Sequence, residues 1–287
     1  MKRKRIGFVG AESMHTVYFG SILAAGVGGL DSSSGHLWAP DTPQLALPRM
    51  AAGELADSCA SLDELLEISD AVMILPRDGD SHRELAEACI AQGKPVFVDK
   101  PFACSAEDAE AMLAFAEQSG VPLMGGSTLC WLPETAEAAR LAREAAEITI
   151  SFAADWYSPH GGWYYYGSHL TDLCAAIAGC DPIGLEAARE GNRVQALVRY
   201  PELLVRLDGS PEQQALVFKF TGRAGAVTEL AVPDYERCYR LGMERFSRML
   251  REGESVHPER LLFSTRLLDT IIKTLNGDEI VLSGFLH

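Results

Sequence analysis

Over its first 122 residues the sequence alternates short apolar runs with segments of helical periodicity, and this alternation most constrains the fold. The predicted strands are 6–9, 36–39, 71–75 and 96–98. The predicted helices between and after them are 13–25, 61–68, 81–92 and 106–119. Ser61 and Glu64 are spaced as a capping box, and Gly93 and Gly120 follow two helices at their C-terminal ends. Strands that alternate with helices build crossover units, so residues 1–122 are predicted to form a doubly wound parallel sheet.

Beyond residue 123 the pattern changes to one typical of antiparallel strands with one solvated face. Polar and apolar residues alternate in "EITISFAADW", "NRVQALVRYPELLVRLDG" and "ALVFKFTGRAGAVTEL". Two helical segments follow, at about 233–251 and 257–275. Residues 123–287 are therefore expected to form an α+β domain with an open, mainly antiparallel sheet. An open sheet face needs a partner, which suggests a homo-oligomer built through the sheet of this domain.

Charge and composition exclude several classes of partner. The formal net charge of −15 argues against a nucleic-acid backbone or an anionic membrane as the main partner. No run of about 18 apolar residues predicts a transmembrane helix, and the basic start "MKRKR" lacks the apolar core of a signal peptide. Seven scattered cysteines show no spacing for zinc or for a disulfide framework. We expect a cytoplasmic protein without a bound metal.

The turn after the first strand is where a dinucleotide would bind in a sheet of this kind. In "GFVGAESMHTVYFG", Gly10 can serve as the first glycine of the fingerprint, but Glu12 and His15 stand at the second and third positions. The acidic residue expected after the second strand is replaced by Ala39, with Asp41 two residues later. From the turn alone, a dinucleotide-binding domain and a doubly wound domain without a cofactor remain equally good interpretations.

The segment "GKPVFVDKPFACSAEDAEAM" resembles the Gfo/Idh/MocA oxidoreductase family, whose fifth strand ends in a Glu-Lys-Pro or Asp-Lys-Pro turn. Here that turn is Asp99, Lys100 and Pro101. The likeness extends to "SHRELAEACIAQGKPVFVDKP", to "GSHLTDL" and to the C-terminal "RLGMERFSRMLREGE" and "LLDTIIKTLNGDEIVL". It implies a Rossmann-like N-terminal domain that binds NAD or NADP, and a C-terminal domain for substrate binding and oligomerisation.

The resemblance also implies a reaction, which is hydride transfer between nicotinamide and a carbinol or ketone carbon of a sugar, a polyol or another small molecule. It places Lys100 beside the nicotinamide and His169 at the substrate oxygen. A lysine at the end of a buried strand can have a lowered pKa, which suits proton transfer. The alternative for Lys100 is a lysine that only solvates the end of a strand. The expected cofactor contacts are Gly10, Ala11, Glu12, Ser13, Met14, Ala39, Leu75, Pro76, Asp99, Lys100 and Pro101.

The family pattern carries an aspartate four residues before the histidine, and this chain has Tyr165 there. A phenol can donate a hydrogen bond but does not supply the negative charge that favours imidazolium. Asp172, one helical turn after His169, could replace it as the orienting carboxylate. The competing interpretation, which we favour slightly, is an acid in the first turn of a helix capped by Ser168. The candidate catalytic set is therefore Lys100, His169, Tyr165 and Asp172.

The aromatic residues before His169 suggest a pocket that stacks on a sugar face. The expected substrate contacts are Trp163, Tyr164, Tyr166 and His169, and a core or interface patch is an equal alternative. Many relatives carry an arginine-containing segment where this chain has Leu129 and Cys130. Two other functions remain open, namely a non-catalytic or regulatory nucleotide-binding member of the family and a glycosidase that uses NAD transiently.

Overall fold

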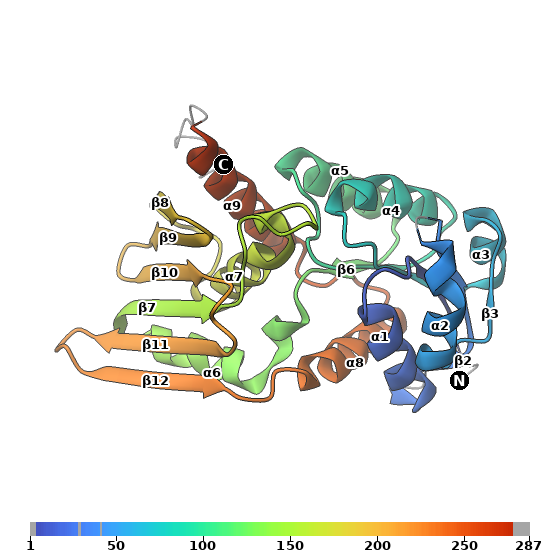
Figure 1. Cartoon of the computed structure of the whole chain (residues 1–287), viewed down its shortest axis with the longest axis horizontal. Coiled ribbons are helices and arrows are strands. Elements are labelled where there is room, and N and C mark those ends of the chain that lie inside the picture. The colour runs from blue at the N-terminus through green and yellow to red at the C-terminus, as the bar shows by residue number, and fades with distance from the viewer. Residues whose placement is uncertain (1–3, 28–29, 41, 278–287) are drawn as a thin grey trace. The chain divides into compact units, whose positions relative to one another are not determined.

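The structure is a computed structural model that describes residues 4–27, 30–40 and 42–277. The chain divides into two compact units, each with its own sheet (Figure 1). The N-terminal unit comprises Met1–Ala103, Glu107–Thr128 and Glu236–Pro258. The C-terminal unit comprises Cys104–Ala106, Leu129–Tyr235 and Glu259–His287. The expected boundary at residue 122 would assign Glu236–Pro258 to the C-terminal domain. In the structure this segment groups with the N-terminal unit.

The N-terminal unit is the doubly wound parallel sheet that the sequence predicts, in the order β3-β2-β1-β4-β5-β6. Its strands are β1 (Lys4–Val9), β2 (Leu30–Trp38), β3 (Asp57–Ser58), β4 (Ala71–Ile74), β5 (Val96–Val98) and β6 (Leu123–Gly125). Its helices are α1 (His15–Ala24), α2 (Pro43–Gly53), α3 (Leu62–Ile68), α4 (His82–Ala91), α5 (Ala106–Ser119) and α8 (Arg237–Glu252), with a 3-10 turn at η2 (Gly79–Ser81). Figure 1 shows α4 and α5 on one face of this sheet and α1 and α8 on the other.

Local sequence signals account for most of these elements. Every residue of β4 and β5 is buried, as expected of parallel strands covered on both faces. The Ser61 hydroxyl accepts a hydrogen bond from the backbone N–H of Glu64 at 3.2 Å, which caps α3 as predicted. Gly93 and Gly120 have φ of 67° and 62°, so each supplies the left-handed residue that follows α4 or α5.

Two elements depart from the sequence expectation because their signals are atypical. Helix α2 was not predicted: Pro43 opens it and Pro48 lies inside it, and prolines usually argue against a helix. Strand β2 begins at Leu30, six residues earlier than predicted, and its register on β1 shifts between Arg5 and Gly7. The extra length falls on a polar Ser/Gly stretch that carries no alternation.

The C-terminal unit is built on a mixed, mainly antiparallel sheet in the order β12-β11-β7-β10-β9-β8. Its strands are β7 (Ala145–Phe152), β8 (Gly184–Glu190), β9 (Arg193–Arg199), β10 (Leu204–Gly209), β11 (Leu216–Gly222) and β12 (Val227–Val232). Its helices are α6 (Pro133–Ala142), α7 (Trp163–Ala178) and α9 (Pro258–Asn276), with a 3-10 turn at η3 (Thr128–Trp131). Only the β7–β10 pair is parallel. This arrangement confirms the predicted α+β class.

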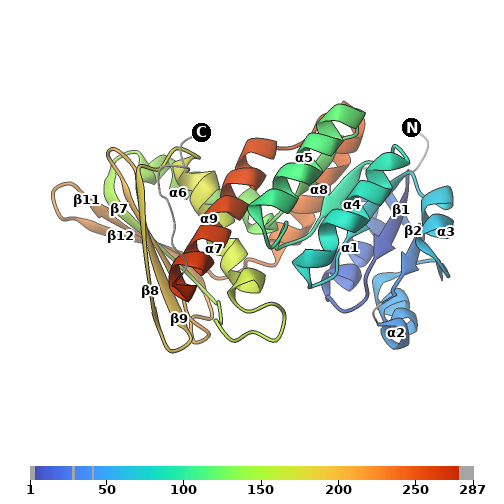
Figure 2. The same cartoon turned by 90° about the horizontal axis from the view of Figure 1, so that it is seen from above.

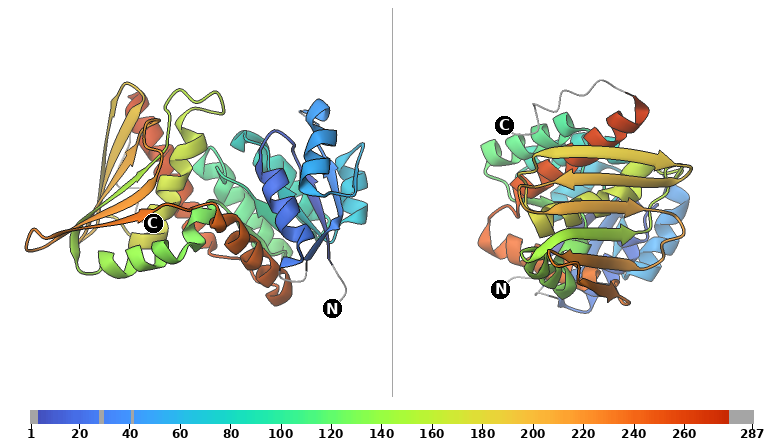
Figure 3. Two further views of the ribbon diagram at one scale, coloured as in Figure 1. Left: turned by 60° about the horizontal axis from the view of Figure 1, so that its bottom comes forward. Right: turned by 90° about the vertical axis from the view of Figure 1, so that its left-hand side faces the viewer.

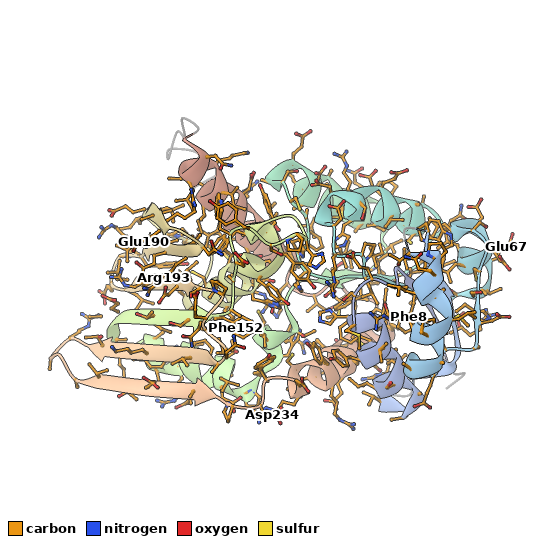
Figure 4. The ribbon with its side chains drawn as sticks, in the orientation of Figure 1. Phe8, Glu67, Phe152, Glu190, Arg193 and Asp234 are labelled. Carbon is orange, nitrogen blue, oxygen red and sulfur yellow. The ribbon has the colours of Figure 1, made fainter. Side chains whose placement is uncertain are left out.

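Helices of the C-terminal unit cover one face of its sheet, and α9 runs beside α7 (Figure 2). The other face is turned to the viewer in Figure 3, right, where no described helix of this unit covers it. Cross-strand ion pairs lie on this open face, and Figure 4 labels Arg193 among them. The pairs are Arg193–Asp208 at 2.7 Å, Arg199–Glu186 at 2.6 Å and Arg206–Glu147 at 3.2 Å. Within residues 4–27, 30–40 and 42–277, no helix is long and apolar enough to cross a bilayer.

Candidate active site

The turn after β1 has the backbone geometry of a phosphate-binding turn. Gly10 has φ of +94°, and a Cβ there would lie 2.9 Å from the backbone nitrogen of Pro76. The position therefore requires glycine both for its conformation and for the close approach of the β4 loop. The Gly10 carbonyl accepts a hydrogen bond from the Thr16 hydroxyl at 2.8 Å, and the Gly10 N–H donates to the Trp38 carbonyl at 2.9 Å. Ala39, directly after β2, lies buried next to this turn.

The residues between Gly10 and α1 leave the amino end of the helix without a side-chain cap among the described residues. Ala11 and Ser13 are buried, and Glu12 and Met14 are half-buried. The Ser13 hydroxyl accepts the N–H of His15 at 3.1 Å, which stiffens the turn. Asp41, the other acidic candidate after β2, lies outside the described residues.

An arginine that the sequence did not indicate lies against this turn. Arg49 of α2 donates from Nε to the Ala11 carbonyl at 3.0 Å, and its Nη1 lies 2.6 Å from the Met14 sulfur. Its Nη2 lies 3.5 Å from the Glu12 carbonyl. Because α2 was not predicted, no sequence signal placed a cation here. The guanidinium brings a positive charge to a turn where Glu12 brings a negative one.

The Asp99-Lys100-Pro101 turn follows β5 at the same edge of the sheet. Asp99 and Lys100 are each 3% exposed, and the Lys100–Pro101 peptide bond is cis. Burial lowers the pKa of Lys100 to about 7; the Asp99 carboxylate opposes this shift, and the guanidinium of Arg77 adds to it. Because Lys100 is buried, it does not serve only to solvate the end of the strand. With this pKa, its amine can gain or lose a proton near neutral pH.

The half-buried His15 and the buried Asp99 form a pair that joins α1 to the end of β5. The His15 Nδ1 lies 2.6 Å from Asp99 Oδ2. Burial alone would raise the pKa of Asp99, but the charge and hydrogen bond of His15, with the nearby Lys100, lower it below its usual value. The carboxylate is therefore ionised and accepts the imidazole N–H. In the fingerprint pattern His15 replaces a glycine, and here its ring fills that position.

His82, at the start of α4, connects the loops after β4 and β5. Its ring is fully buried, with Nε2 3.0 Å from the Pro76 carbonyl and Nδ1 3.4 Å from the Phe102 carbonyl. Burial lowers the pKa of His82, so the ring is neutral and its single N–H is best assigned to the shorter contact. Leu75 and Pro76, both expected at the cofactor edge, are held by this contact and by the Leu75 N–H bond to the Val9 carbonyl.

In the C-terminal unit, His169 lies on α7 within a group of aromatic rings. Its ring meets Phe152 edge-on at 5.4 Å and stacks on Tyr166 at 6.0 Å between centroids. Phe152, labelled in Figure 4, ends β7. His169 is 9% exposed and Tyr166 is 38% exposed. Tyr166 therefore offers a ring face to solvent beside the imidazole, which suits contact with the apolar face of a sugar.

Helix α7 begins at Trp163, so the Gly-Ser-His segment lies inside the helix rather than before it. The interpretation of Ser168 as a cap and of Asp172 as a first-turn acid was wrong, because the Ser168 hydroxyl donates to the Tyr165 carbonyl at 3.1 Å one turn earlier. Tyr165, His169 and Asp172 lie on neighbouring turns of one helix face. Tyr165 is 5% exposed and Asp172 is 4% exposed.

Two of the expected substrate contacts, Trp163 and Tyr164, make contacts within the C-terminal unit. Trp163 is 2% exposed, and a Cβ on Gly167 would lie 2.4 Å from its ring, so the ring packs directly over that glycine. The Tyr164 hydroxyl donates to Asp269 of α9 at 3.3 Å. Of the aromatic residues expected at the substrate, only Tyr166 combines exposure with contact to His169.

The described residues fit a nicotinamide dinucleotide. Gly10 allows a close backbone approach, α1 begins directly after this turn, and Arg49 adds a cation. These features gather at the carboxyl ends of β1 and β4, where the strand order reverses. Lys100, after β5, lies at the same edge.

Comparisons with known proteins agree with this arrangement. Residues 4–127 match the family model described as "Oxidoreductase family, NAD-binding Rossmann fold", of the Gfo/Idh/MocA group. A D-apiose dehydrogenase from Paraburkholderia graminis is 36% identical over 91 residues, which cover 31% of this chain and 23% of that protein. The match therefore spans about a quarter of the curated relative.

Two solved structures share the fold over nearly the whole chain. Levoglucosan dehydrogenase, in complex with NADH and levoglucosan, has a TM-score of 0.80 at 13% identity, covering 97% of this chain and 98% of that one. The apo scyllo-inositol dehydrogenase from Lactobacillus casei has a TM-score of 0.81 at 13% identity, covering 99% of both chains. The strand order, the Asp-Lys-Pro turn and the family match lead to one conclusion. Residues 4–127, which make up less than half of the chain, are similar to the NAD-binding domain of the Gfo/Idh/MocA oxidoreductase family.

Proposed function

We propose that the chain is an NAD- or NADP-dependent oxidoreductase that oxidises a carbinol of a sugar, a polyol or a related small molecule, and reduces the corresponding ketone. The observation that carries this proposal is the buried Lys100 with a pKa of about 7, at the sheet edge that holds the glycine turn. The sugar class is supported by the similar proteins, which include a D-apiose dehydrogenase and a levoglucosan dehydrogenase.

When bound, the nicotinamide supplies the hydride acceptor for the oxidation and the hydride donor for the reduction. In the oxidation, the neutral Lys100 amine takes the proton of the substrate hydroxyl as a hydride leaves the carbon that bears this hydroxyl. His169 holds the substrate oxygen by a hydrogen bond and steadies the charge that develops on it. Tyr166 stacks on the substrate, while Tyr165 and Asp172 orient the imidazole from the same helix.

The lowered pKa of Lys100 gives the two directions opposite pH dependences. The oxidation needs the neutral amine, which is populated above a pH of about 7, so its kcat should rise with pH and then level off. The reduction needs the protonated amine, so its kcat should fall as the pH rises through the same value. If one group transfers the proton in both directions, the two pH profiles of kcat should have their inflection at the same pH and slope in opposite directions.

We infer that the backbone of residues 10–14, with Arg49, holds the cofactor phosphates, and that Leu75, Pro76 and the 99–101 turn line the nicotinamide end. Titration with NADH and with NADPH, followed by nicotinamide fluorescence, tests this. Arg49→Ala should weaken binding of the preferred nucleotide about 10-fold, which corresponds to about 1.4 kcal/mol, within the range for a hydrogen bond to a charged group.

The matched control for Arg49 is Arg83→Ala. Arg83 lies on α4, on the opposite face of the same sheet, and pairs with Glu87 and Asp108. This variant should bind the nucleotide as the native protein does. Equal affinity of the Arg49 variant and the native protein would remove Arg49 from the phosphate site, and no binding of either nucleotide to the native protein would refute the proposed function.

The open sheet of the C-terminal unit supports a further proposal, a homo-oligomer formed through that sheet. The three cross-strand ion pairs of this face are each formed within one chain, so a second copy can cover these six charges without leaving them unpaired. Native mass spectrometry is expected to give a multiple of the 31.1 kDa chain mass. A species of 31.1 kDa alone at micromolar concentration would contradict this proposal.

The cytoplasm remains the proposed location. All seven cysteines are free thiols, and four of them are buried, which suits a reducing compartment.

A further inference from the structure

His15 is enclosed on several sides by side chains of the N-terminal unit. Its ring centroid lies 5.1 Å from that of Phe19 on α1 and 5.1 Å from that of Tyr239 on α8. Its Nδ1 is fixed by Asp99 at 2.6 Å, and the side chain is 12% exposed. An imidazole held by two rings and a carboxylate has little freedom to turn, so its N–H stays directed at Asp99.

Asp99 is shared between two basic groups. On one side it accepts the His15 N–H, and on the other it lies next to Lys100 in the chain and attracts the protonated amine. A buried carboxylate needs partners, because an unpaired charge in the interior is costly. The more completely His15 satisfies Asp99, the less the carboxylate favours a proton on Lys100.

We propose that His15 is a positioning residue for Lys100, because it occupies the Asp99 carboxylate and so weakens the attraction of that carboxylate for the lysine amine. The effect of His15 on turnover rests on the proposed function. The effect of His15 on the Lys100 amine does not, because the His15–Asp99 contact exists without substrate. This role of His15 also explains why the glycine of the fingerprint can be absent here. A glycine at position 15 would remove the imidazole partner of Asp99.

Charged and titratable groups from several elements of the unit face this cluster. They include His15 of α1, Arg77 after β4, Asp99 with Lys100 after β5, and His82 at the start of α4. Tyr18 and Tyr239 stack on each other at 5.0 Å beside His15. Arg77 lowers the pKa of Lys100 and Asp99 raises it, so a change at His15 acts through the second of these.

The test is a direct titration of Lys100 in the absence of substrate. The chain has six lysines, so a sample labelled with carbon-13 at the lysine ε-carbon gives few NMR signals, and Lys100→Arg assigns one of them. The native signal should titrate with a midpoint near 7. His15→Phe keeps the ring but removes the N–H, and its midpoint should rise by about 1 unit, because Asp99 then has lost its imidazole partner and favours the protonated lysine more strongly.

Two further variants keep the inference open to refutation if His15→Phe does not fold. His15→Asn retains a donor for Asp99 and should titrate between the native protein and His15→Phe. Asp99→Asn removes the carboxylate and should move the Lys100 midpoint downward. A midpoint that stays at the native value in His15→Phe, or in Asp99→Asn, would overturn the inference.

The same variants separate this inference from the proposed function. If the native protein turns over a substrate, the inflection in the pH profile of kcat should move upward with the NMR midpoint in His15→Phe, whereas a purely structural role would lower kcat without moving it. If the native protein binds nucleotide but turns over no carbinol, the proposed function fails, and the Lys100 titration still decides the role of His15.

Discussion

Lys100→Met is expected to lower kcat for carbinol oxidation by about 100- to 10,000-fold, the range in which a positioned general base contributes. Methionine keeps the length and the buried packing of the side chain but has no group that can take a proton. Cofactor affinity should change little, because the proposed phosphate contacts lie in the turn after β1. Steady-state kinetics on a panel of sugars and polyols, with nucleotide binding measured on the same sample, provides the test.

The matched control is Lys94→Met, which removes a second lysine from the same unit just before β5. The Lys94 amine donates to the Ser69 carbonyl at 2.9 Å, away from the glycine turn. The kcat of Lys94→Met should equal that of the native protein. A lower kcat in this control would show that losing any lysine of the unit reduces turnover. Equal kcat in Lys100→Met and the native protein would show that Lys100 is not the proton-transfer group.

Features carried by contiguous residues could be predicted from the sequence. The burial of β4 and β5 and the caps of α3, α4 and α5 depend on a few neighbouring positions, and the Asp99-Lys100-Pro101 turn is a local motif. These signals placed Lys100 at a strand end, and the structure adds that it is buried. Local signals therefore gave the parallel sheet and one half of the candidate site.

Contacts between distant positions could not be predicted in this way. His15 and Asp99 are 84 positions apart, and Arg49 reaches Ala11 across 38 positions. The position of Arg49 was not predicted, because its helix contains two prolines and was itself not predicted. His15 was recognised only as a missing glycine, because a fingerprint reports which residue is absent and not which partner the replacement finds. The start of α7 was misjudged for a related reason: Gly167, which reads as a helix breaker, is needed under the Trp163 ring.

His169→Phe is expected to lower kcat for oxidation and for reduction by about 100- to 1000-fold, as loss of one donor to a developing oxyanion does. Phenylalanine keeps the contacts with Phe152 and Tyr166, so the thermal midpoint should stay close to the native one. The affinity for NADH should also be retained, because the proposed phosphate contacts belong to the N-terminal unit. His257→Asn serves as the control: His257 is exposed, and its φ of 50° is one that asparagine tolerates. If His169→Phe retains native kcat while Lys100→Met does not, the substrate oxygen is held by another group, and Tyr166→Phe and Asp172→Asn are the next variants to measure.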